Sequence, residues 1–518
     1  MKKTRLFPCL LCALGVSASA AEHLWADFDA APTGSVANLP GWTRASWLGG
    51  ITARVDNINY SHSPSNILEL PWNATASSAV FTNFNSTYTT NEHPVIRCSA
   101  KLVTINTNAY FQLGLRNSAS GAFLSFQGTN GYGTFGTETH DSVFFPLVND
   151  RFVDVTFFYN RSNNHYRLDY DHTNRLAWSS NNAPSSVVHT QFNQFVVARP
   201  GGTAGTTGTF IVDDVSVETF PAHVWAWFRC DSTRHLIDHL GAFMPTQATA
   251  SAILPGASDP AWDGTADFHN EGAARQFYSS RANGAVALPA SPDWTAEAVF
   301  RLPPGAGNTA FLSWGKAQGF DTNGAYVNLG WNAAASAFYY SLRDSQQATT
   351  DYEWSSDAGA FVPDDRWHHF AFVKAASAVS VYLDYVQITN FSLTTGYADG
   401  SYAFDSQFRA SVGMSLNYGN TSGPDTYIDE VRVSGKALAR SEFLQPGQPV
   451  IVSIADESPW HIPIKGILGH TYRLEASPVF GPAAAWQPIA TTTVVSTFGA
   501  FDVARAAATN FFRVIRAD

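Results

Sequence analysis

Residues 364–373 read Asp-Asp-Arg-Trp-His-His-Phe-Ala-Phe-Val, and residues 149–158 read Asn-Asp-Arg-Phe-Val-Asp-Val-Thr-Phe-Phe. The two stretches lie 215 positions apart, and at the same offset Leu168-Asp169-Tyr170 recurs as Leu383-Asp384-Tyr385. Alternation of apolar and polar residues followed by a turn is typical of a half-buried strand. A repeat with so long a period indicates a duplicated structural unit.

Two further matches extend the repeat to both ends of the unit. Residues 211–217, Ile-Val-Asp-Asp-Val-Ser-Val, match residues 427–433, Tyr-Ile-Asp-Glu-Val-Arg-Val. Near the beginning, residues 23–28 resemble residues 223–228 at a shorter offset. Because all matches keep the same order, the sequence predicts two related modules.

Many short alternating strands separated by turn residues predict an all-β fold with two tandem jelly-roll sandwiches. The modules are residues 22–219 and 222–445, joined around Pro221, and residues 447–518 form a third, small β-unit. A helical period is kept only from Ala437 to Phe443, directly after the second module.

The first 21 residues have the features of a secretory signal peptide. Lys2, Lys3 and Arg5 precede an apolar run from Leu6 to Val16, and small residues follow up to Ala21. The run is too short to span a bilayer, and no later segment is long and apolar enough to do so. We therefore expect a secreted protein without a transmembrane segment.

Composition agrees with an extracellular β-protein. Charged residues and aromatic residues each make up 14% of the chain, although charged residues usually make up about a quarter. The net charge of −11 includes three cations of the leader, so the mature chain carries about −14. This charge argues against nucleic acid or an anionic membrane as a partner.

Four cysteines are present, and two of them, Cys98 and Cys230, follow the leader. Two cysteines are neither a disulfide framework nor a metal-binding spacing. They are either two buried free thiols or a bridge between the modules.

Three segments of the second module share the pattern of one known family. Residues 365–373 match a Trp-His-x-Φ-Ala-Φ strand, where Φ is apolar. Residues 382–386 match a Leu-Tyr-x-Asp-Gly-x hairpin, with Tyr385 in place of the usual turn glycine. Residues 427–443 match a closing strand followed by a short helix. Together they resemble the laminin-G-like family of concanavalin A-like lectin folds, and through the repeat the first module resembles it as well.

The resemblance implies jelly-roll sandwiches that recognise an extracellular polysaccharide or glycoconjugate without catalysis. Residues 447–518 resemble the fibronectin-like C-terminal modules of secreted bacterial surface proteins, which implies a spacer or attachment role. Two alternatives stay open, because the same sandwich hosts several functions. They are a polysaccharide-degrading enzyme, either glycoside hydrolase or lyase, and a structural or adhesive cell-surface protein.

Catalytic motifs common on this fold are missing from the sequence. The Glu-x-Asp-x-x-Glu strand of jelly-roll glucanases places two carboxylates on one face, but no Glu of this chain has an Asp two residues later. His-Glu-x-x-His and Gly-x-Ser-x-Gly are also absent. We therefore expect that the protein is not an enzyme.

Each module ends in a strand that carries an acid among apolar residues. With strict alternation, Asp213 shares a face with Ile211, Val215 and Val217, and Asp429 shares one with Tyr427, Val431 and Val433. A carboxylate on an apolar face is costly unless it is paired or bound to a cation.

Two explanations of these acids are open. The carboxylates accept hydrogen bonds from backbone amides or an Arg, or each helps to hold a structural Ca²⁺. In the calcium hypothesis, oxygen ligands also come from the first strand of each module, from Asp29 or Asp27 in the first and from Asp231 in the second.

The Trp367-His368-His369 run could suggest a metal site. Neighbouring residues on a strand point to opposite faces, so the two histidines do not easily bind one ion. We expect Trp367 to be a core anchor and His368 or His369 to be a surface residue.

Aromatic residues in loops are candidates for stacking on sugar rings, because the CH-rich face of a pyranose packs well on an aromatic ring. Most of the aromatic residues must form the cores. The candidates are Trp262, Tyr352, Trp354 and Tyr418 in the second module and Tyr132 in the first.

Overall fold

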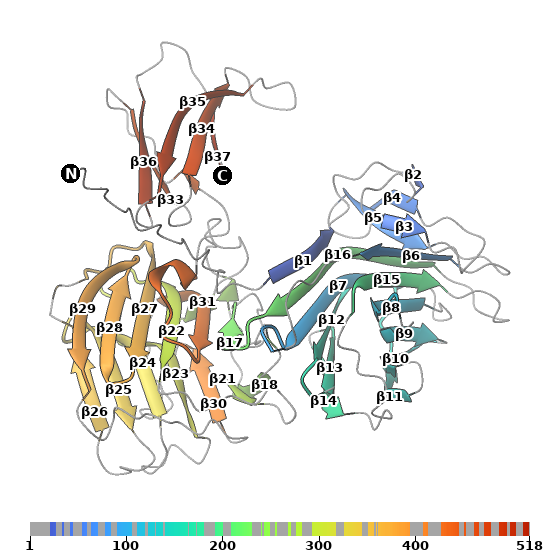
Figure 1. Ribbon diagram of the computed structural model, residues 1–518, viewed down its shortest axis with the longest axis horizontal. Coiled ribbons are helices and arrows are strands. Elements are labelled where there is room, and N and C mark those ends of the chain that lie inside the picture. Colours follow the sequence, from blue (N-terminus) through green and yellow to red (C-terminus); the bar gives the residue numbers. More distant parts are fainter. Residues whose placement is uncertain are drawn as a thin grey trace, which may run out of the picture.

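The computed structural model describes residues 21–26, 34–35, 42–44, 54–59, 64–70, 78–83, 91–105, 111–119, 123–129, 131–137, 140–163, 165–171, 173–180, 192–199, 209–229, 240, 243–248, 254–255, 268–270, 276–281, 293–316, 326–343, 351–356, 359, 361–393, 408–412, 426–444, 450–451, 460–465, 471–477, 486–494, 498–503 and 511–516. Most of these residues lie in strands, so the all-β prediction is confirmed (Figure 1). The predicted helical turn after the second module is a 3-10 helix, η2 (Arg440–Glu442). None of the described residues forms a helix of the length and apolarity that a bilayer crossing requires.

The first sandwich consists of two antiparallel sheets. The order in the nine-stranded sheet is β14 (Thr173–Ser180), β13 (His165–Tyr170), β12 (Val153–Asn160), β7 (Val95–Ile105), β16 (Thr209–Phe220), β5 (Pro64–Leu70), β4 (Arg54–Asn59) and β2 (Gly34–Ser35), with β1 (Ala21–Ala26) paired to β16. The order in the seven-stranded sheet is β11 (His140–Pro146), β10 (Tyr132–Thr137), β9 (Phe123–Thr129), β8 (Phe111–Arg116), β15 (Gln194–Arg199), β6 (Ser78–Asn83) and β3 (Trp42–Arg44).

The second sandwich repeats this arrangement. The order in the eight-stranded sheet is β29 (Val386–Ser392), β28 (Ala378–Leu383), β27 (Trp367–Ala375), β22 (Trp294–Arg301), β31 (Thr426–Ser434), β20 (Phe268–Asn270) and β19 (Leu254–Pro255), with β17 (Val224–Phe228) paired to β31. The order in its seven-stranded sheet is β26 (Asp351–Ser355), β25 (Ala337–Arg343), β24 (Tyr326–Asn332), β23 (Thr309–Lys316), β30 (Phe408–Val412), β21 (Gln276–Arg281) and β18 (Phe243–Ala248).

The two strand orders correspond, as the sequence repeat predicts, except that β2 has no counterpart in the eight-stranded sheet. In both sandwiches the closing strand, β16 or β31, lies inside its sheet and also pairs with the first strand of the repeat, β1 or β17. Each repeat therefore brings its beginning and its end together in one sheet.

The remaining strands form two small sheets. One is β32 (Val450–Ile451), β33 (Trp460–Lys465) and β36 (Phe498–Val503), and the other is β35 (Gln487–Thr493), β34 (Thr471–Ser477) and β37 (Phe511–Arg516). Ile462 and Phe501 of the first sheet pack with Tyr472 and Leu474 of the second in one apolar cluster.

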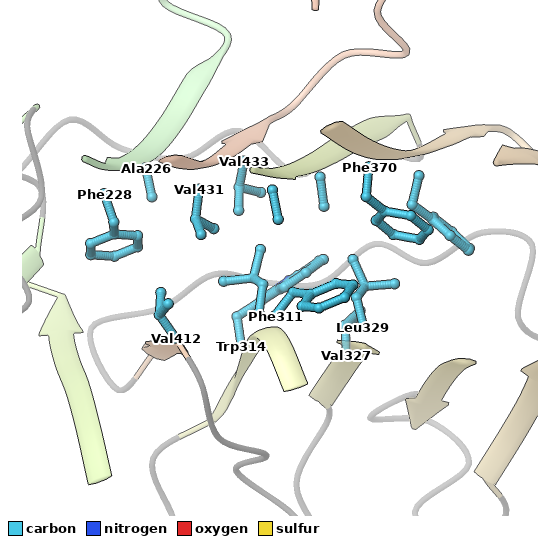
Figure 2. Packing of buried hydrophobic residues seen from close by; sticks show 14 of the residues in the cluster. Ala226, Phe228, Phe311, Trp314, Val327, Leu329, Phe370, Val412, Val431 and Val433 are labelled. Carbon is cyan, nitrogen blue, oxygen red and sulfur yellow. The ribbon is translucent and has the colours of Figure 1, made fainter. Parts of the chain in front are cut away.

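Aromatic contacts across the two layers hold each sandwich together. In the first, the rings of Phe111 (β8) and Phe210 (β16) are stacked with centroids 5.0 Å apart. In the second, Phe311 packs below the eight-stranded sheet and its ring lies 4.3 Å from that of Phe300. Figure 2 shows this core, with Val431 and Val433 of β31 above the side chains of the opposite layer. Cys98 is buried and free in the core of the first sandwich.

The closing strand of the first sandwich carries a β-bulge. Asp213 of β16 pairs with Lys101 of β7, but the next pair is Ser216 with Ser99, so β16 has one residue more than its partner. The prediction that Asp213 faces the core with Val215 and Val217 is therefore wrong, because alternation fails at the extra residue. The side chains of β16 that pack in the core are Phe210, Val212, Val215 and Val217.

The closing strand of the second sandwich has the same bulge. Ile428 pairs with Phe300 and Val431 pairs with Ala298, which again leaves one extra residue on the closing strand. Ile428, Val431 and Val433 belong to the core. The prediction that Asp429 shares the face of Val431 and Val433 is wrong for the same reason.

A segment that we call the strap, residues 437–444, covers the outer face of the eight-stranded sheet. Leu438 and Phe443 pack there on Ala371, Val373 and Tyr385. Both polar groups of the Leu444 backbone are hydrogen-bonded. Its N–H donates to Oε1 of Glu297 (2.7 Å), and its carbonyl accepts from Oη of Tyr385 (2.5 Å).

A buried ion pair lies beneath the strap. Nε and Nη2 of Arg432 donate to Oε2 of Glu297 at 2.8 and 2.6 Å, and Nη2 also donates to the carbonyl of Glu442. Burial raises the pKa of Glu297, but the neighbouring Arg432 and His369 outweigh it and hold that pKa below its usual value. Glu297 is thus a buried anion that joins two strands to the strap.

The hairpin between β28 and β29 has no glycine in its turn, where Asp384 and Tyr385 take the two central positions. Asp384 and Tyr385 both have positive φ, 47° and 66°, as a type I′ turn requires. A non-glycine residue in this conformation costs about 1–2 kcal/mol. The Tyr385 ring is fully buried against the strap and its hydroxyl is hydrogen-bonded, which offsets that cost.

We expect Arg432→Met to lower the free energy of unfolding by about 3–5 kcal/mol, because it leaves the buried Glu297 charge without its main partner. Lys436→Met is the matched control. It removes a half-exposed partner of Glu442 in the same region and should cost less than about 1 kcal/mol. Urea unfolding followed by fluorescence measures both, and equal losses would contradict the account.

Candidate functional site

Two aromatic side chains are exposed on the first sandwich, and we call them the aromatic platform. Tyr132 (β10) is 43% exposed and Phe144 (β11) is 64% exposed. Their rings are stacked, with centroids 4.7 Å apart and an interplanar angle of 16°. Among the described side chains, these are the only exposed aromatic ones. They lie face to face, so each ring covers one face of the other.

The β10–β11 pairing positions the platform. Thr134 pairs with Phe144, and Tyr132 pairs with Pro146, so all four residues lie on the outer face of the seven-stranded sheet. Both rings therefore stand on one pair of hydrogen-bonded strands, which keeps them in place without a flexible loop.

A glycine below the platform lets these strands approach the core closely. A Cβ at Gly133 would lie 2.8 Å from the ring of Phe126 and 2.9 Å from that of Phe145. Those two rings are stacked in the core with centroids 5.9 Å apart. Gly133 thus allows β10 to lie directly on the inner aromatic layer while Tyr132 faces outward.

Amide side chains continue from the platform across the outer face. Phe144, Thr134, Gln127 and Gln112 are successive register partners on β11, β10, β9 and β8. Gln112 and Gln127 are half-buried, and Nε2 of Gln127 donates to Oγ of Ser125 at 2.9 Å. The row offers hydrogen-bonding groups beside the apolar rings.

A second polar ladder crosses the same sheet farther along the strands. Nη1 of Arg116 donates to Oε1 of Gln194 at 2.8 Å, and Nε2 of Gln194 donates to Oδ1 of Asn83 at 2.9 Å. These bonds connect β8, β15 and β6 and fix the orientation of the Gln194 and Asn83 amides.

The equivalent positions of the second sandwich have no aromatic residue. One row of paired core residues in each sandwich sets the correspondence. In the first sandwich the row is Phe135, Phe126, Leu113 and Val197, and in the second it is Tyr340, Leu329, Leu312 and Val412. Counting along the strands from these rows, Tyr132 corresponds to Ala337 and Phe144 corresponds to Ser355. Neither platform residue therefore has an aromatic counterpart, although Tyr339 of the second sandwich stands at the position of Thr134.

The structure describes part of the predicted stacking set. Tyr132 is exposed, as a stacking role requires, whereas Trp262 and Tyr418 lie outside the described residues. Tyr352 and Trp354 lie on β26, where the backbone alone is described, and pair with Leu342 and Tyr340. Their stacking role stays a prediction.

Phe144 was missed by the sequence analysis. The signal was the Phe144-Phe145 pair within a strand, because one of two adjacent strand residues must face outward. Phe145 is in the core, and Phe144 is the exposed one.

The acids of the bulges do not form a metal site with the other described residues. Oδ1 of Asp213 accepts the N–H of Asp214 at 2.9 Å, and Asp214 pairs with Lys101 at 2.5 Å. Glu430 accepts hydrogen bonds from Nε1 of Trp227 and from Nε of Arg229. No three His, Cys, Asp or Glu side chains of the described part are grouped as a metal requires. Asp27, Asp29 and Asp231 lie outside it.

The histidine run points to opposite faces, but neither residue is fully exposed. His369 is buried beneath the strap, stacked on Tyr385 with centroids 4.5 Å apart and 3.1 Å from Oε1 of Glu297. His368 packs against the ring of Phe361 on the other face. The prediction of a surface histidine is wrong for His369, which the strap covers, whereas His368 is partly exposed. Trp367 is buried as expected, with its ring against Tyr427.

Both ring nitrogens of His368 face carboxylates. Nδ1 lies 2.7 Å from Oδ2 of Asp384, and Nε2 lies 2.9 Å from Oδ1 of Asp364. Only the charged imidazolium donates to both at once. Burial lowers the pKa of His368, but the hydrogen bonds and charges of Asp384 and Asp364 outweigh it, so the pKa is raised.

We expect the stability of the second sandwich to fall at alkaline pH. A histidine whose pKa is higher in the folded than in the unfolded state stabilises the fold fully below its ordinary pKa of 6.5, and this contribution is lost as the pH rises through the folded pKa. His368→Gln should remove that part of the pH dependence. Urea unfolding from pH 6 to 9 measures it, and identical pH profiles of the variant and the unmodified protein would exclude this role.

No protein-family model matches the sequence, and no curated protein matches it either. Similar solved structures include the CBM40 of the Ruminococcus gnavus IT-sialidase, at 13% identity and a TM-score of 0.27, covering 33% of this chain and 91% of that one. Domain 4 of AbnA, a GH43 extracellular arabinanase from Geobacillus stearothermophilus solved with arabinotriose, has 17% identity and a TM-score of 0.25, covering 42% and 95%. The NanB sialidase from Streptococcus pneumoniae has 14% identity and a TM-score of 0.25, covering 35% and 31%.

These neighbours are carbohydrate-binding modules and sialidase or arabinanase domains. Similarity this low carries no argument about function, which must rest on the residues of the chain itself.

Proposed function

We propose that this protein binds carbohydrate without catalysis, and that a sugar ring packs on the aromatic platform of Tyr132 and Phe144. The observation that carries the proposal is the stacked, exposed pair on two hydrogen-bonded strands. Large apolar surface left in water on a rigid element is typical of a binding site. A sugar ring would pack by its apolar CH face on the face of Phe144 or Tyr132 that the other ring does not cover.

The polar row beside the platform supports a carbohydrate rather than a purely apolar ligand. Binding sites for small polar molecules combine an apolar surface with a few well-placed hydrogen-bonding groups. Gln127 and Gln112 supply both donors and acceptors, which match sugar hydroxyls. A glycan chain that stacks on Phe144 and lies across the strands would pass over these amides.

The same proposal includes the finer assignments made from sequence. We propose a laminin-G-like relationship on the strand at residues 367–375, the glycine-free type I′ hairpin, and the closing strand followed by η2. Export rests on the leader-like residues 1–21, and a spacer or attachment role is proposed for residues 447–518.

Calcium remains a hypothesis for the end of the second sandwich. Asp429 is fully buried, and its proposed partner Asp231 is outside the described residues. For the first sandwich, the backbone amide at Asp214 already supplies a partner for Asp213. Elemental analysis of the purified protein tests the hypothesis, which predicts about one calcium per chain and a lower Tm after EDTA treatment. A metal-free protein with an unchanged Tm excludes it.

We expect Tyr132→Ala and Phe144→Ala each to weaken glycan binding about tenfold or more, or about 1.4 kcal/mol, as for a central aromatic contact. Tyr132→Phe keeps the stacked ring and should bind nearly as the unmodified protein does. Val362→Ala, at an exposed apolar residue of the second sandwich, is the surface control. Affinity electrophoresis with laminarin, xylan, arabinan, galactomannan and alginate measures the binding.

The same incubations are scored for reducing and unsaturated ends, which separates binding from catalysis. Retention on a polysaccharide without product supports the proposal. Release of product would contradict the non-catalytic part of it. Unchanged binding of both alanine variants would contradict the site.

A further inference from the structure

We propose that the glycan bound at the aromatic platform is an acidic polysaccharide, and that Arg175 binds a uronate carboxylate of the chain that stacks on Phe144. The inference rests on the proposed function of the platform. Arg175 lies on β14, the edge strand of the nine-stranded sheet, and Phe144 lies on β11, the edge strand of the seven-stranded sheet. These two edges lie against each other at the same side of the first sandwich (Figure 1).

The guanidinium of Arg175 lies beside the strand that carries the platform. Its Cζ is 5.3 Å from the centroid of the Phe145 ring, and Phe145 directly follows Phe144 on β11. Because neighbouring strand residues point to opposite faces, Phe144 and Arg175 lie on the two sides of this edge strand. Phe144 and Pro146 of β11 are exposed and Arg175 is partly exposed, so a glycan that leaves the platform over the edge of β11 reaches the arginine.

Arg175 has no partner among the described residues. Its Nε is buried without a hydrogen bond, and no ion pair joins the guanidinium to another described side chain. Two other arginines of the same sandwich are paired. Arg151 donates to both oxygens of Asp171 at 2.9 and 2.5 Å, and Arg167 donates to both oxygens of Asp169 at 3.2 and 2.7 Å.

A carboxylate is the group that completes Arg175. The planar guanidinium presents its N–H donors as a fork, which matches the two oxygens of a carboxylate. The chain itself supplies such a carboxylate to Arg151 and to Arg167. A uronic acid offers the same group together with an apolar CH face, which suits the ring of Phe144.

The charge around Arg175 is positive although the chain as a whole is acidic. The charges of Arg151, Asp171 and Arg175 all act on Tyr170, so the three groups lie near this ring. Two of them form an ion pair with each other, which leaves the positive charge of Arg175. Exposed charges more than about 8 Å apart are largely screened at physiological salt, so this local cation can attract an anion despite the net charge of −11.

The test uses affinity electrophoresis of the full chain with alginate, a polyuronate, and with galactomannan, which is neutral. Arg175→Gln should weaken the retention by alginate about tenfold or more and leave the retention by galactomannan unchanged. Arg175→Lys keeps the charge but not the fork, so its retention by alginate should lie between those of Arg175→Gln and the unmodified protein.

Arg366→Gln is the matched control. It removes the charge of an arginine of the second sandwich whose side chain is 72% exposed, and it should leave the retention by alginate unchanged. Retention of the unmodified protein by alginate should weaken between about 0.05 and 0.5 M NaCl, and that of Arg175→Gln should depend less on salt. The Tm of each variant shows that the sandwich is folded.

Four outcomes would overturn the assignment of Arg175. They are retention by galactomannan without retention by alginate, unchanged retention of Arg175→Gln by alginate, an equal loss for Arg366→Gln, and an equal loss of Arg175→Gln on both polysaccharides. Retention by dextran sulfate but not by alginate would show that the anion is not a carboxylate and would overturn it as well. Failure of the platform itself is recognised separately, by full binding of Tyr132→Ala/Phe144→Ala to every probe.

Discussion

One extra residue in the closing strand sets the register on which each sandwich depends. The closing strands pair on both sides and with the first strand of their repeat, so a change of register there would turn whole rows of side chains to the wrong face. The bulge places Val212 and Val215 in the first core, and Ile428 and Val431 in the second, although two acids lie between them. The acids thereby leave the core face: Lys101 pairs with Asp214, and Trp227 and Arg229 donate to Glu430.

Because both repeats keep this register, their outer faces can be compared position by position. The first sandwich has Tyr132 and Phe144 where the second has Ala337 and Ser355. Farther along the strands, Val196 of the first corresponds to Ser411 of the second. The shared core tolerates such exchanges because outer residues do not contribute to it.

Charged groups at and beneath the surface have a structural role in the second sandwich. Glu297 is hydrogen-bonded to Arg432, His369 and the backbone of Leu444, so it joins two strands to the strap. His368 connects the turn at Asp384 to the segment at Asp364. These networks give His368, His369 and Glu297 a structural role.

The sequence predicted the repeat, the all-β class and the strands with clear alternation, such as Val153–Asn160 and Trp367–Ala375. The sequence analysis placed Asp213 and Asp429 on the wrong face of their strands. Each strand has one extra residue there, which interrupts the period of two without changing the local composition. Burial of His369 depends on the strap, which is distant in sequence. Stacking of Tyr132 on Phe144 depends on strand register, which no single segment contains.

Hydrogen–deuterium exchange of the full chain, with and without a saturating polysaccharide, tests the central claim most directly. The account predicts that peptides from β10 and β11, residues 131–146, exchange more slowly when the glycan is bound, whereas peptides from the C-terminal sheets do not change. Protection confined to the C-terminal sheets, with none in residues 131–146, would contradict it.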